Sequence, residues 1–413
     1  MEREGKFDMK LLFICGAKIV GGALKCAPWI KSLAANLSGE FELTIASTEA
    51  EPEPPATLAV GARQVTLCGC YKLIGDENGL APYDAIVLFG TDNLYTRDVL
   101  KVFKERGVLD KTAVFAQGVL YPCALHYAEG VPARVIKRFT FRDLLRRQNI
   151  KREQKILLRR AEAEREALAL TKNFIGRTTM DKAILRLYNQ NAEYYRCNDV
   201  LRDPFYEGRW NLASCEKHRI FVSQFYYPLK GFHYLIEAAN LLKGKYPDLK
   251  IAAAGYDPIQ KPLPQKELKD SSYIRYIKEL IKRYELSESI DLLGTLDEQR
   301  MKEEYLKANV FVMPSTIENS PNSLAEAMAL GVPTVASDVG GVTDFAQHKT
   351  EAYIYPSSAV YLLANYIDSV FSDAEKTETM ARNGRARALR EYDRRRNIAA
   401  FENALKSIAQ KHD

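Results

Sequence analysis

The chain has 413 residues, which is too long for one ordinary hydrophobic core and suits two domains of roughly 200 residues each. Its 46% hydrophobic and 27% charged residues exclude a disordered chain, and no apolar run reaches the length of about 18 residues that a membrane span needs. The net charge of +6 is concentrated in residues 134–172, with 13 Lys or Arg against 5 Asp or Glu, which excludes a uniformly basic protein.

The cysteines and the start of the chain indicate a cytoplasmic protein. Seven scattered cysteines, an odd number, are typical of a reducing compartment. The charged opening MEREGKFDMK argues against a signal peptide. Cys68 and Cys70 have the spacing of a metal-binding pair, but no second pair or suitably spaced histidine completes a site, so we expect plain thiols and no metal.

Strand and helix patterns alternate through the first half. The apolar runs KLLFICGA, FELTIAS, DAIVLFG, TAVFAQG and KNFIG predict buried strands. Helices are expected over residues 24–37 and in a stretch that ends at Val108, and Gly21 and Gly22 loosen the turn before the first of them. The proline-rich EAEPEPPAT reads as a loop. This alternation predicts a parallel, doubly wound sheet.

The same alternation restarts after residues 203–214, where periodicity lapses and a domain boundary is expected. Strands are predicted in HRIFVSQ, LKIAAAG, IDLLG, VFVMPS, PTVAS and EAYIYP, and helical patterns fill the end of the chain. We therefore predict an α/β protein with two Rossmann-like domains facing a central cleft. In such sheets ligands bind outside the carboxyl ends of the strands.

The stretch STIENSPNSLAEAMAL holds two glutamates around a helix start. Ser320 is a suitable N-cap, Pro321 fits the first helical position, and the helix is expected to run to about Leu330. Glu318 then lies in the loop before the helix, and Glu326 lies on its second turn. One interpretation is simply a capped helix with two surface glutamates.

The other interpretation is a site for an extended, phosphate-bearing ligand. The N–H groups of Asn322, Ser323 and Leu324 would lie at the positive end of the helix dipole, where an anion is stabilised. Carboxylates on either side could then accept hydrogen bonds from sugar hydroxyls. Lys230, in YPLKGF, also stands at a predicted helix start, where a cation is disfavoured unless an anion binds nearby, although an ordinary solvated lysine remains the alternative. The glycines of GGAL form no G-x-G-x-x-G fingerprint, which counts against a dinucleotide dehydrogenase.

Three stretches resemble the retaining family 4 glycosyltransferases that build bacterial surface polysaccharides. They are LKGFHYLIEAANLLKGKYPDLKIAAAG, DLLGTLDEQRMKEEYLKANVFVMPS, and Glu318 through EAMALGVPTVASDVGG. The resemblance implies a GT-B fold: residues 1–212 as an acceptor-binding domain, residues 213–395 as a nucleotide-sugar-binding domain, and residues 396–413 as a C-terminal helix that crosses back to the first domain.

The resemblance also implies roles for single residues. Lys230 would bind the donor diphosphate, Glu326 the ribose, and Glu318 would face the donor sugar. The remaining implied donor contacts are Asn322, Ser323 and Leu324 at phosphate and ribose, Gly294 and Leu296 beside the base, and Gly21 and Gly22 from the other domain. His126 is the implied N-terminal-domain histidine, with Asp92 and Gln117 as comparable candidates.

Two positions depart from the family pattern. Phe225 stands where the family usually has an arginine, so one cation fewer would hold the diphosphate unless Arg177 or a rearranged loop compensates. The family's Gly-Gly-x-x-Glu ends here in the shorter Asp344.

The resemblance implies a retaining, metal-independent transfer of a hexose-type sugar from a UDP- or GDP-sugar to a glycan or lipid-linked saccharide, with no bound cofactor. A non-catalytic nucleotide-sugar-binding subunit is an alternative, because one arginine is missing. A glycoside hydrolase that uses the two glutamates as acid and base is a further one, disfavoured by the phosphate-type helix start between them.

The basic segment, residues 134–172, permits two interpretations. Its apolar residues, Phe139, Phe141, Leu144, Leu145, Ile156 and Leu157, lie among Lys and Arg. The segment could be an ordinary exposed helix pair, or it could contact an anionic membrane on the cytoplasmic face. Nucleic acid is not the expected partner, because the aromatic residues are expected on the apolar side of the helices, away from the basic side chains that would contact phosphate.

Overall fold

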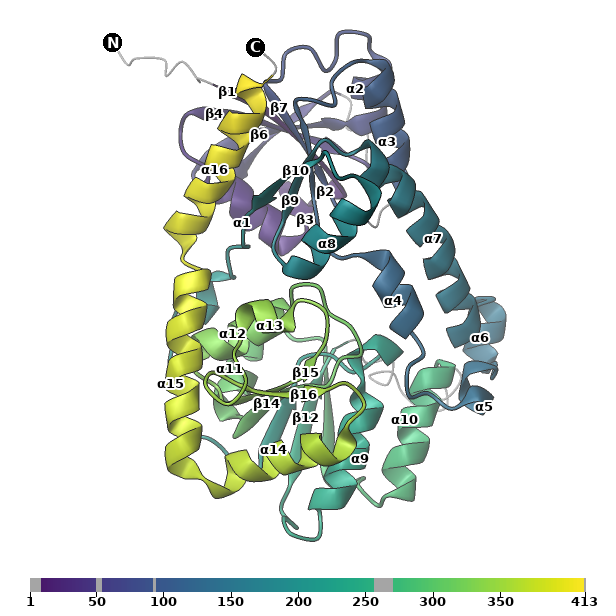
Figure 1. The fold of residues 1–413 in the computed structure, drawn as a ribbon, viewed down its shortest axis with the longest axis vertical. Helices are drawn as coiled ribbons and strands as arrows, with labels where there is room; N and C mark the ends of the chain where they lie inside the picture. Colours follow the sequence, from purple (N-terminus) through teal and green to yellow (C-terminus); the bar gives the residue numbers. More distant parts are fainter. Residues whose placement is uncertain (1–8, 50–53, 92–93, 256–269, 412–413) are drawn as a thin grey trace. The chain divides into compact units, whose positions relative to one another are not determined.

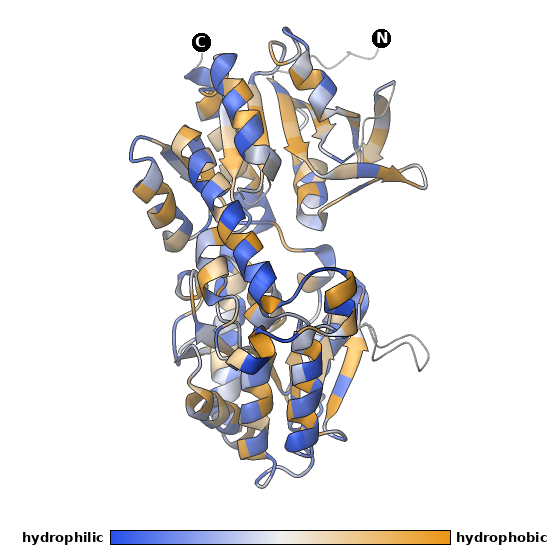
Figure 2. Cartoon of the chain, turned by 90° about the vertical axis from the view of Figure 1, so that its right-hand side faces the viewer, coloured by the Kyte–Doolittle hydropathy of each residue, from blue (hydrophilic) through white to orange (hydrophobic). Residues whose placement is uncertain are grey.

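The computed structural model describes residues 9–49, 54–91, 94–255 and 270–411 (Figure 1). The chain divides into two compact units. The first unit combines Met1–Leu120, Arg160–Arg202 and Tyr392–Asp413, and the second combines Tyr121–Arg159 with Asp203–Glu391. In both units the strands are mainly hydrophobic, whereas the outer helices carry hydrophilic residues on one face (Figure 2). Each unit therefore has the layered α/β construction that the alternating sequence pattern predicts.

The first unit is built on an eight-stranded sheet of order β10-β9-β8-β7-β1-β4-β6-β5, parallel except for β5, which pairs antiparallel with β6. Its strands are β1 Met9–Cys15, β4 Phe41–Ser47, β5 Ala56–Val60, β6 Arg63–Gly69, β7 Ala85–Phe89, β8 Thr112–Phe115, β9 Asn173–Gly176 and β10 Glu193–Arg196. Its helices are α1 Pro28–Asn36, α2 Cys70–Gly75, α3 Leu94–Glu105, α8 Thr179–Tyr188 and α16 Arg394–Gln410, and α7 Ile150–Leu170 begins in the second unit and ends in the first.

The C-terminal helix α16 packs on the core of the first unit. The Phe401 ring lies 6.1 Å from Phe13 of β1 and 5.9 Å from Phe115 at the end of β8. The Glu402 carboxylate accepts a hydrogen bond of 2.6 Å from the Ser38 backbone N–H. Thus the last helix is held in the first unit by both apolar and polar contacts.

The second unit contains a six-stranded parallel sheet of order β13-β12-β11-β14-β15-β16. Its strands are β11 Arg219–Val222, β12 Lys250–Ala254, β13 Ile290–Gly294, β14 Val310–Met313, β15 Thr334–Asp338 and β16 Tyr353–Pro356. Numbered within the unit, this order is 3-2-1-4-5-6, the doubly wound arrangement whose topological switch point falls between β11 and β14.

The second unit also contains helices, the first of which begins at the boundary residue Leu120. They are α4 Leu120–His126, α5 Ala133–Ile136, α6 Phe141–Leu145, α9 Phe232–Leu242, α10 Ser272–Arg283, α11 Glu298–Lys307, α12 Asn322–Leu330, α13 Val342–Phe345, α14 Val360–Ser372 and α15 Ala374–Glu391. Helix α9 is largely buried, with Phe232, Leu235 and Ile236 fully buried. These residues belong to the main hydrophobic core of the unit.

Residues Tyr121–Arg159 group with the second unit, whereas the sequence analysis placed them in a first domain of residues 1–212. The Arg138 guanidinium contacts the Glu279 carboxylate at 2.7 and 3.3 Å, and Val135 is buried in the core of the second unit. Thr140 Oγ1 donates to the Asp270 carbonyl over 2.7 Å. An amphipathic helical pattern indicates that the apolar face of a helix is buried, but it does not indicate against which sheet. The sequence therefore could not assign Tyr121–Arg159 to one unit or the other.

The GGAL turn differs from the prediction. A two-stranded hairpin of β2 Ala17–Val20 and β3 Ala23–Cys26 replaces the expected strand-to-helix turn, and the helix begins at Pro28 rather than near residue 24. Gly21 and Gly22 both have positive φ, 58° and 76°, as a two-residue hairpin turn of the primed type requires. The β5–β6 hairpin and β10 were also not predicted.

Candidate functional site

The candidate site lies at the carboxyl ends of β11 and β14, neighbouring strands at the switch point of the second sheet. In open α/β sheets ligands bind at this point, because the chain leaves the two strands in opposite directions and opens a crevice there. The loop after β11 carries Lys230, and the loop after β14 carries Glu318. Two residues 88 positions apart in the sequence are therefore brought to one place.

The local backbone positions Lys230. A 3-10 turn, Pro228–Lys230, ends at Gly231, which has φ 61° and ψ 20° and precedes helix α9. A Cβ on Gly231 would lie 1.8 Å from the Pro314 carbonyl oxygen, so both the positive φ and this close approach require glycine. The approach sets Lys230 against the loop that follows β14.

That loop is held by hydrogen bonds from three directions. Ser337 Oγ donates to the Ser315 carbonyl over 2.6 Å, and the Thr316 N–H donates to the Leu229 carbonyl over 2.8 Å. The Gly341 N–H donates to the Glu318 carbonyl over 3.1 Å. The Gly-Gly of the sequence motif therefore fixes the backbone that carries Glu318.

Lys230 and Glu318 form an ion pair in which Lys230 Nζ lies 2.5 Å from Glu318 Oε1. Ser315 Oγ donates to the same carboxylate oxygen over 2.7 Å. The two charged side chains are only 18% and 13% exposed. Burial lowers the pKa of Lys230, but the negative charge of Glu318 and the hydrogen bonds to Glu318 and Tyr227 more than offset this effect, so the pKa is raised and the ammonium is retained. Burial raises the pKa of Tyr227 to about 12.

Sequence reasoning missed two residues of this cluster. The ring of Tyr227 lies beneath the Lys230 ammonium, with the nitrogen 5.6 Å from the ring centroid, and Ser315 supplies the hydroxyl that orients Glu318. Both stand within a few residues of Lys230 or Glu318, so a search for donors and aromatics in the same loops could have found them.

Helix α12 begins later than predicted. Pro321 is the N-cap residue, with φ −76° and ψ 104°, no side chain caps the helix, and the Ser320 hydroxyl is buried with no hydrogen-bond partner among the described residues. The Leu324 N–H already donates to the Pro321 carbonyl over 3.1 Å, which corrects the expectation that this group is exposed. Asn322 and Ser323, both half-buried, form the first turn at the positive end of the helix dipole.

The other carboxylate, Glu326, is on the second turn of α12, as predicted, and is 6% exposed. Gly294 ends the edge strand β13, where its carbonyl accepts a hydrogen bond of 2.9 Å from the Gly255 N–H. Leu296 is half-buried in the loop that follows. Both residues lie at the same carboxyl edge of the sheet as the Lys230–Glu318 pair.

His126 belongs to the second unit rather than to the N-terminal domain in which it was expected. Its carbonyl accepts a hydrogen bond of 3.1 Å from Thr316 Oγ1, so its backbone lies beside the loop that carries Glu318. The imidazole Nδ1 lies 2.5 Å from Glu129 Oε2, and Glu129 Oε1 accepts a hydrogen bond of 2.9 Å from Ser357. Glu129 thus fixes the orientation of the ring.

The N-terminal candidates lie in the first unit. Gly21 and Gly22 form the β2–β3 turn, and Gln117 follows β8 and is half-buried. Asp92 is outside the described residues.

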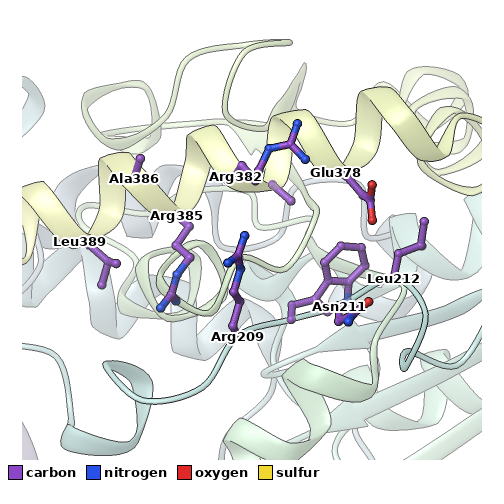
Figure 3. Close-up of a pocket in the computed structure, with 11 residues that line it drawn as sticks. Arg209, Asn211, Leu212, Glu378, Arg382, Arg385, Ala386 and Leu389 are labelled. Carbon is purple, nitrogen blue, oxygen red and sulfur yellow. The ribbon is translucent and has the colours of Figure 1, made fainter.

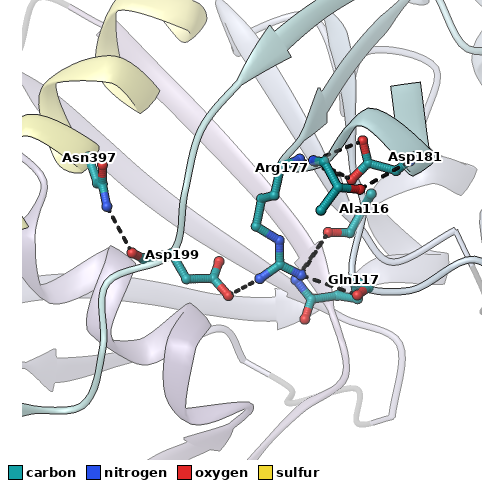
Figure 4. Close-up of polar contacts among 7 residues, drawn as sticks. Ala116, Gln117, Arg177, Asp181, Asp199 and Asn397 are labelled. Carbon is teal, nitrogen blue, oxygen red and sulfur yellow. Dashed lines mark hydrogen bonds and ion pairs between the residues drawn. The ribbon is translucent and has the colours of Figure 1, made fainter. Parts of the chain in front are cut away.

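The departure from the family pattern at Phe225 has a structural explanation. Phe225 is 1% exposed and packs against Phe232, with ring centroids 5.4 Å apart, so this position belongs to the core. Arg177 does not compensate: it is buried in the first unit, paired with Asp199, and donates to the Gln117 carbonyl over 3.1 Å (Figure 4). Its guanidinium is therefore committed to the interior of its own unit.

In the described parts of the chain, no group of three His, Cys, Asp or Glu side chains is arranged to hold a metal ion. None of the seven cysteines forms a disulfide. The helices of the described ranges include none that is long and apolar enough to cross a bilayer.

Comparison with known proteins connects this geometry to a family. Residues 207–387 match the family model of glycosyl transferases group 1. The uncharacterized glycosyltransferase YqgM of Bacillus subtilis is 25% identical over 188 residues, 46% of this chain and 48% of that protein. The capsular polysaccharide biosynthesis glycosyltransferase CapM of Staphylococcus aureus is 24% identical over 158 residues, 38% of each chain. The match thus spans less than half the length of either relative.

Solved structures match over nearly the whole chain. Sucrose-phosphate synthase from Thermosynechococcus elongatus has a TM-score of 0.67 at 16% identity, covering 97% of this chain and 99% of that one. HepE of Anabaena, solved with UDP, has a TM-score of 0.65 at 15% identity and covers 97% and 100%. The fold is therefore the GT-B fold that the sequence resemblance implies, and the family match falls on the unit that holds the Lys230–Glu318 pair.

Proposed function

We propose that the protein is a glycosyltransferase that moves a hexose-type sugar from a nucleotide diphosphate sugar to a glycan or a lipid-linked saccharide, with retention of configuration and without a metal ion. The observation that carries this proposal is the pairing of Lys230 and Glu318 at the switch point, beside the first turn of α12. The glycosyl transferases group 1 match over residues 207–387 supports the reaction class. The relative that acts in capsular polysaccharide biosynthesis supports the class of acceptor.

In this proposal the donor diphosphate competes with Glu318 for Lys230. The ammonium lies 2.5 Å from the carboxylate, and a diphosphate that reaches it brings more negative charge to the same place. Glu318 is then released toward the hydroxyls of the donor sugar, while Ser315 keeps its carboxylate oriented. Glu326 accepts from the ribose, Asn322 and Ser323 donate to phosphate, and Gly294 and Leu296 border the base.

The reaction we propose is a front-face substitution. The bond between the anomeric carbon and the diphosphate oxygen breaks, and the acceptor oxygen bonds to the same carbon on the same face. The acceptor proton moves to the departing diphosphate oxygen, so no protein base is required. Lys230 and the helix start stabilise the negative charge that grows on the diphosphate, and a contact of this kind typically contributes about 3–4 kcal/mol, or 10²–10³ in rate.

A binding subunit without catalysis is the main alternative, since a single lysine stands where the family has two cations. A glycoside hydrolase fits less well. In a glycoside hydrolase the two catalytic carboxyl groups flank the sugar. Here the Glu318 carboxylate accepts hydrogen bonds from Lys230 and Ser315, and the N-terminus of α12 lies between Glu318 and Glu326 along the chain.

The test begins with thermal shift against UDP-, GDP- and ADP-sugars, followed by a transfer assay with and without saccharide acceptors. We expect one nucleotide sugar to raise the melting temperature and to be consumed faster when an acceptor is added. Lys230→Ala should abolish both effects.

Lys245→Ala is the matched control, because Lys245 also forms an ion pair of 2.5 Å, with Asp368, at the far end of α9. Binding without turnover for every acceptor would favour the binding subunit.

We also propose that the basic segment, residues 134–172, contacts an anionic membrane. Helix α6 exposes Phe141 by 54%, Leu144 by 61% and Leu145 by 70%, and the exposed Arg146 and Arg147 follow directly. Apolar side chains that project beside exposed arginines suit a lipid surface with anionic headgroups. Because α6 belongs to the second unit, the contact would present the nucleotide-sugar unit to lipid-linked acceptors.

A further inference from the structure

The second unit contains a cavity of about 670 Å³ between helix α15 and residues 209–212 (Figure 3). It lies beside Gly331, which ends α12, whereas the candidate donor site is at the beginning of the same helix. The volume is typical of pockets that bind small molecules. This cavity is therefore a second place on the unit where a small ligand fits.

Two arginines meet in the cavity with no carboxylate between them. Arg385 donates to the Ala329 carbonyl and so satisfies the C-terminal end of α12. Arg209 is exposed and forms no hydrogen bond or ion pair with any residue in the described ranges. Figure 3 shows the two guanidinium groups side by side, one reaching from each wall. Burial and the charge of Arg209 both lower the pKa of Arg385, the effect expected for two positive groups that nothing neutralises.

The wall that carries Arg209 is rigid. The Trp210 N–H donates to the Leu330 carbonyl over 2.8 Å, and its indole Nε1 donates to the Ala308 carbonyl over 2.7 Å. Trp210 is 6% exposed, so residue 209 is fixed by its neighbour although its own side chain is uncommitted. Because the backbone at residue 209 is already ordered, an anion that binds there restricts only the Arg209 side chain, which costs less conformational entropy than ordering a mobile loop would.

The cavity also has a carboxylate at a distance from this pair. Figure 3 places Glu378 beside Leu212, away from the two guanidinium groups. Arg382 also lines the cavity, and its guanidinium donates to Thr379 Oγ1 over 2.8 Å. Arginine pairs bind phosphate oxygens through parallel N–H donors, and a carboxylate accepts from hydroxyl groups. We propose that the cavity binds a small phosphorylated polyol, with its phosphate on Arg209 and Arg385 and a hydroxyl on Glu378. The site is separate from the donor site and does not depend on the proposed glycosyl transfer.

Calorimetric titration with inorganic phosphate and with glycerol 3-phosphate tests this proposal. The protein should carry Lys230→Ala, so that phosphate binding at the candidate donor site does not contribute. We expect both anions to bind, glycerol 3-phosphate more tightly, and Arg209→Gln to weaken both at least about tenfold, the loss expected for a charge-assisted hydrogen bond. Arg209 is exposed and forms no hydrogen bond or ion pair with a described residue, so this variant should fold normally.

Two further variants make the outcome specific. Glu378→Gln should weaken glycerol 3-phosphate and leave inorganic phosphate unchanged. Arg390→Gln is the matched control, since Arg390 is an exposed arginine of the same helix that pairs with Glu391 outside the cavity, and it should change neither affinity. The proposal is overturned if neither anion binds, if Arg209→Gln binds as tightly as its parent, or if Arg390→Gln weakens binding equally.

Discussion

Replacing Glu318 by Gln tests whether the carboxylate competes with a diphosphate for Lys230. The amide keeps the shape of the side chain and can still accept from Ser315, but the ion pair of 2.5 Å loses its negative partner. Since the pair is largely shielded, at 18% and 13% exposure, the lost competition is worth about 1–2 kcal/mol, near the lower bound for a hydrogen bond to a charged group. Free nucleotide diphosphate should then bind about 5–30-fold more tightly.

Turnover should change in the opposite direction. Once the diphosphate holds Lys230, the carboxylate of Glu318 is proposed to orient the sugar, and the amide does this poorly, so kcat should fall about 10²–10³-fold. Calorimetry with the free diphosphate and initial rates with the donor measure the two effects separately. Glu304→Gln is the control, because Glu304 is equally shielded, at 12% exposure, and pairs with Arg219 on another part of the unit. Unchanged affinity together with unchanged turnover, or loss of diphosphate binding in a folded protein, would refute the reasoning.

Four other outcomes are expected. Glu326→Ala should weaken nucleotide sugar and free nucleotide alike, since ribose contacts are the same in ground and transition states, and unaltered calorimetric affinities would contradict this role. Leu144→Ser with Leu145→Ser should reduce co-sedimentation with anionic vesicles at low salt, and equal binding to neutral vesicles would remove the membrane proposal. Burial lowers the pKa of His233 from 6.5 to about 4 in the folded protein, so as the pH falls the unfolded chain takes up a proton before the folded protein does. The free energy of unfolding should therefore fall by about 3 kcal/mol between pH 7 and pH 4. Urea unfolding curves measure this, and the same fall in His233→Phe would exclude His233 as the cause. Activity should survive EDTA, and a loss that Mg²⁺ restores would mean a metal-dependent mechanism.

The buried parallel strands were the most predictable part of the fold. FELTIAS coincides with β4, and the expected strand in IDLLG coincides with β13, because a continuous apolar run bounded by turn residues is a local signal. The GGAL turn was misassigned for an equally local reason. A glycine pair permits positive φ, but this is compatible with either a strand or a helix after the turn. The hairpin forms because the flanking residues pair, with Val20 opposite Ala23.

Tertiary contacts were beyond local reasoning. The two glutamates could be placed around a helix start from the sequence, yet nothing near Glu318 indicates that Lys230 is its partner. That contact depends on the adjacency of β11 and β14, which follows from sheet order rather than from either loop. The helix start itself moved by one position, because Pro321 took the N-cap place that Ser320 was expected to fill.

The substitution of Phe225 for an arginine has a consequence for the proposed donor site. Phe225 is a buried core residue in contact with Phe232, so restoring an arginine there would bury an unpaired charge instead of rebuilding the site. Arg177 is bonded to Asp199 in the first unit and is equally committed. The negative charge of the diphosphate would therefore be stabilised by Lys230 and by the first turn of α12, whose dipole orientation is set by the fold. We infer that donor affinity depends more steeply on Lys230 in this protein than it would if a second cation stood beside it. The ion pair with Glu318 would then determine how readily the donor binds.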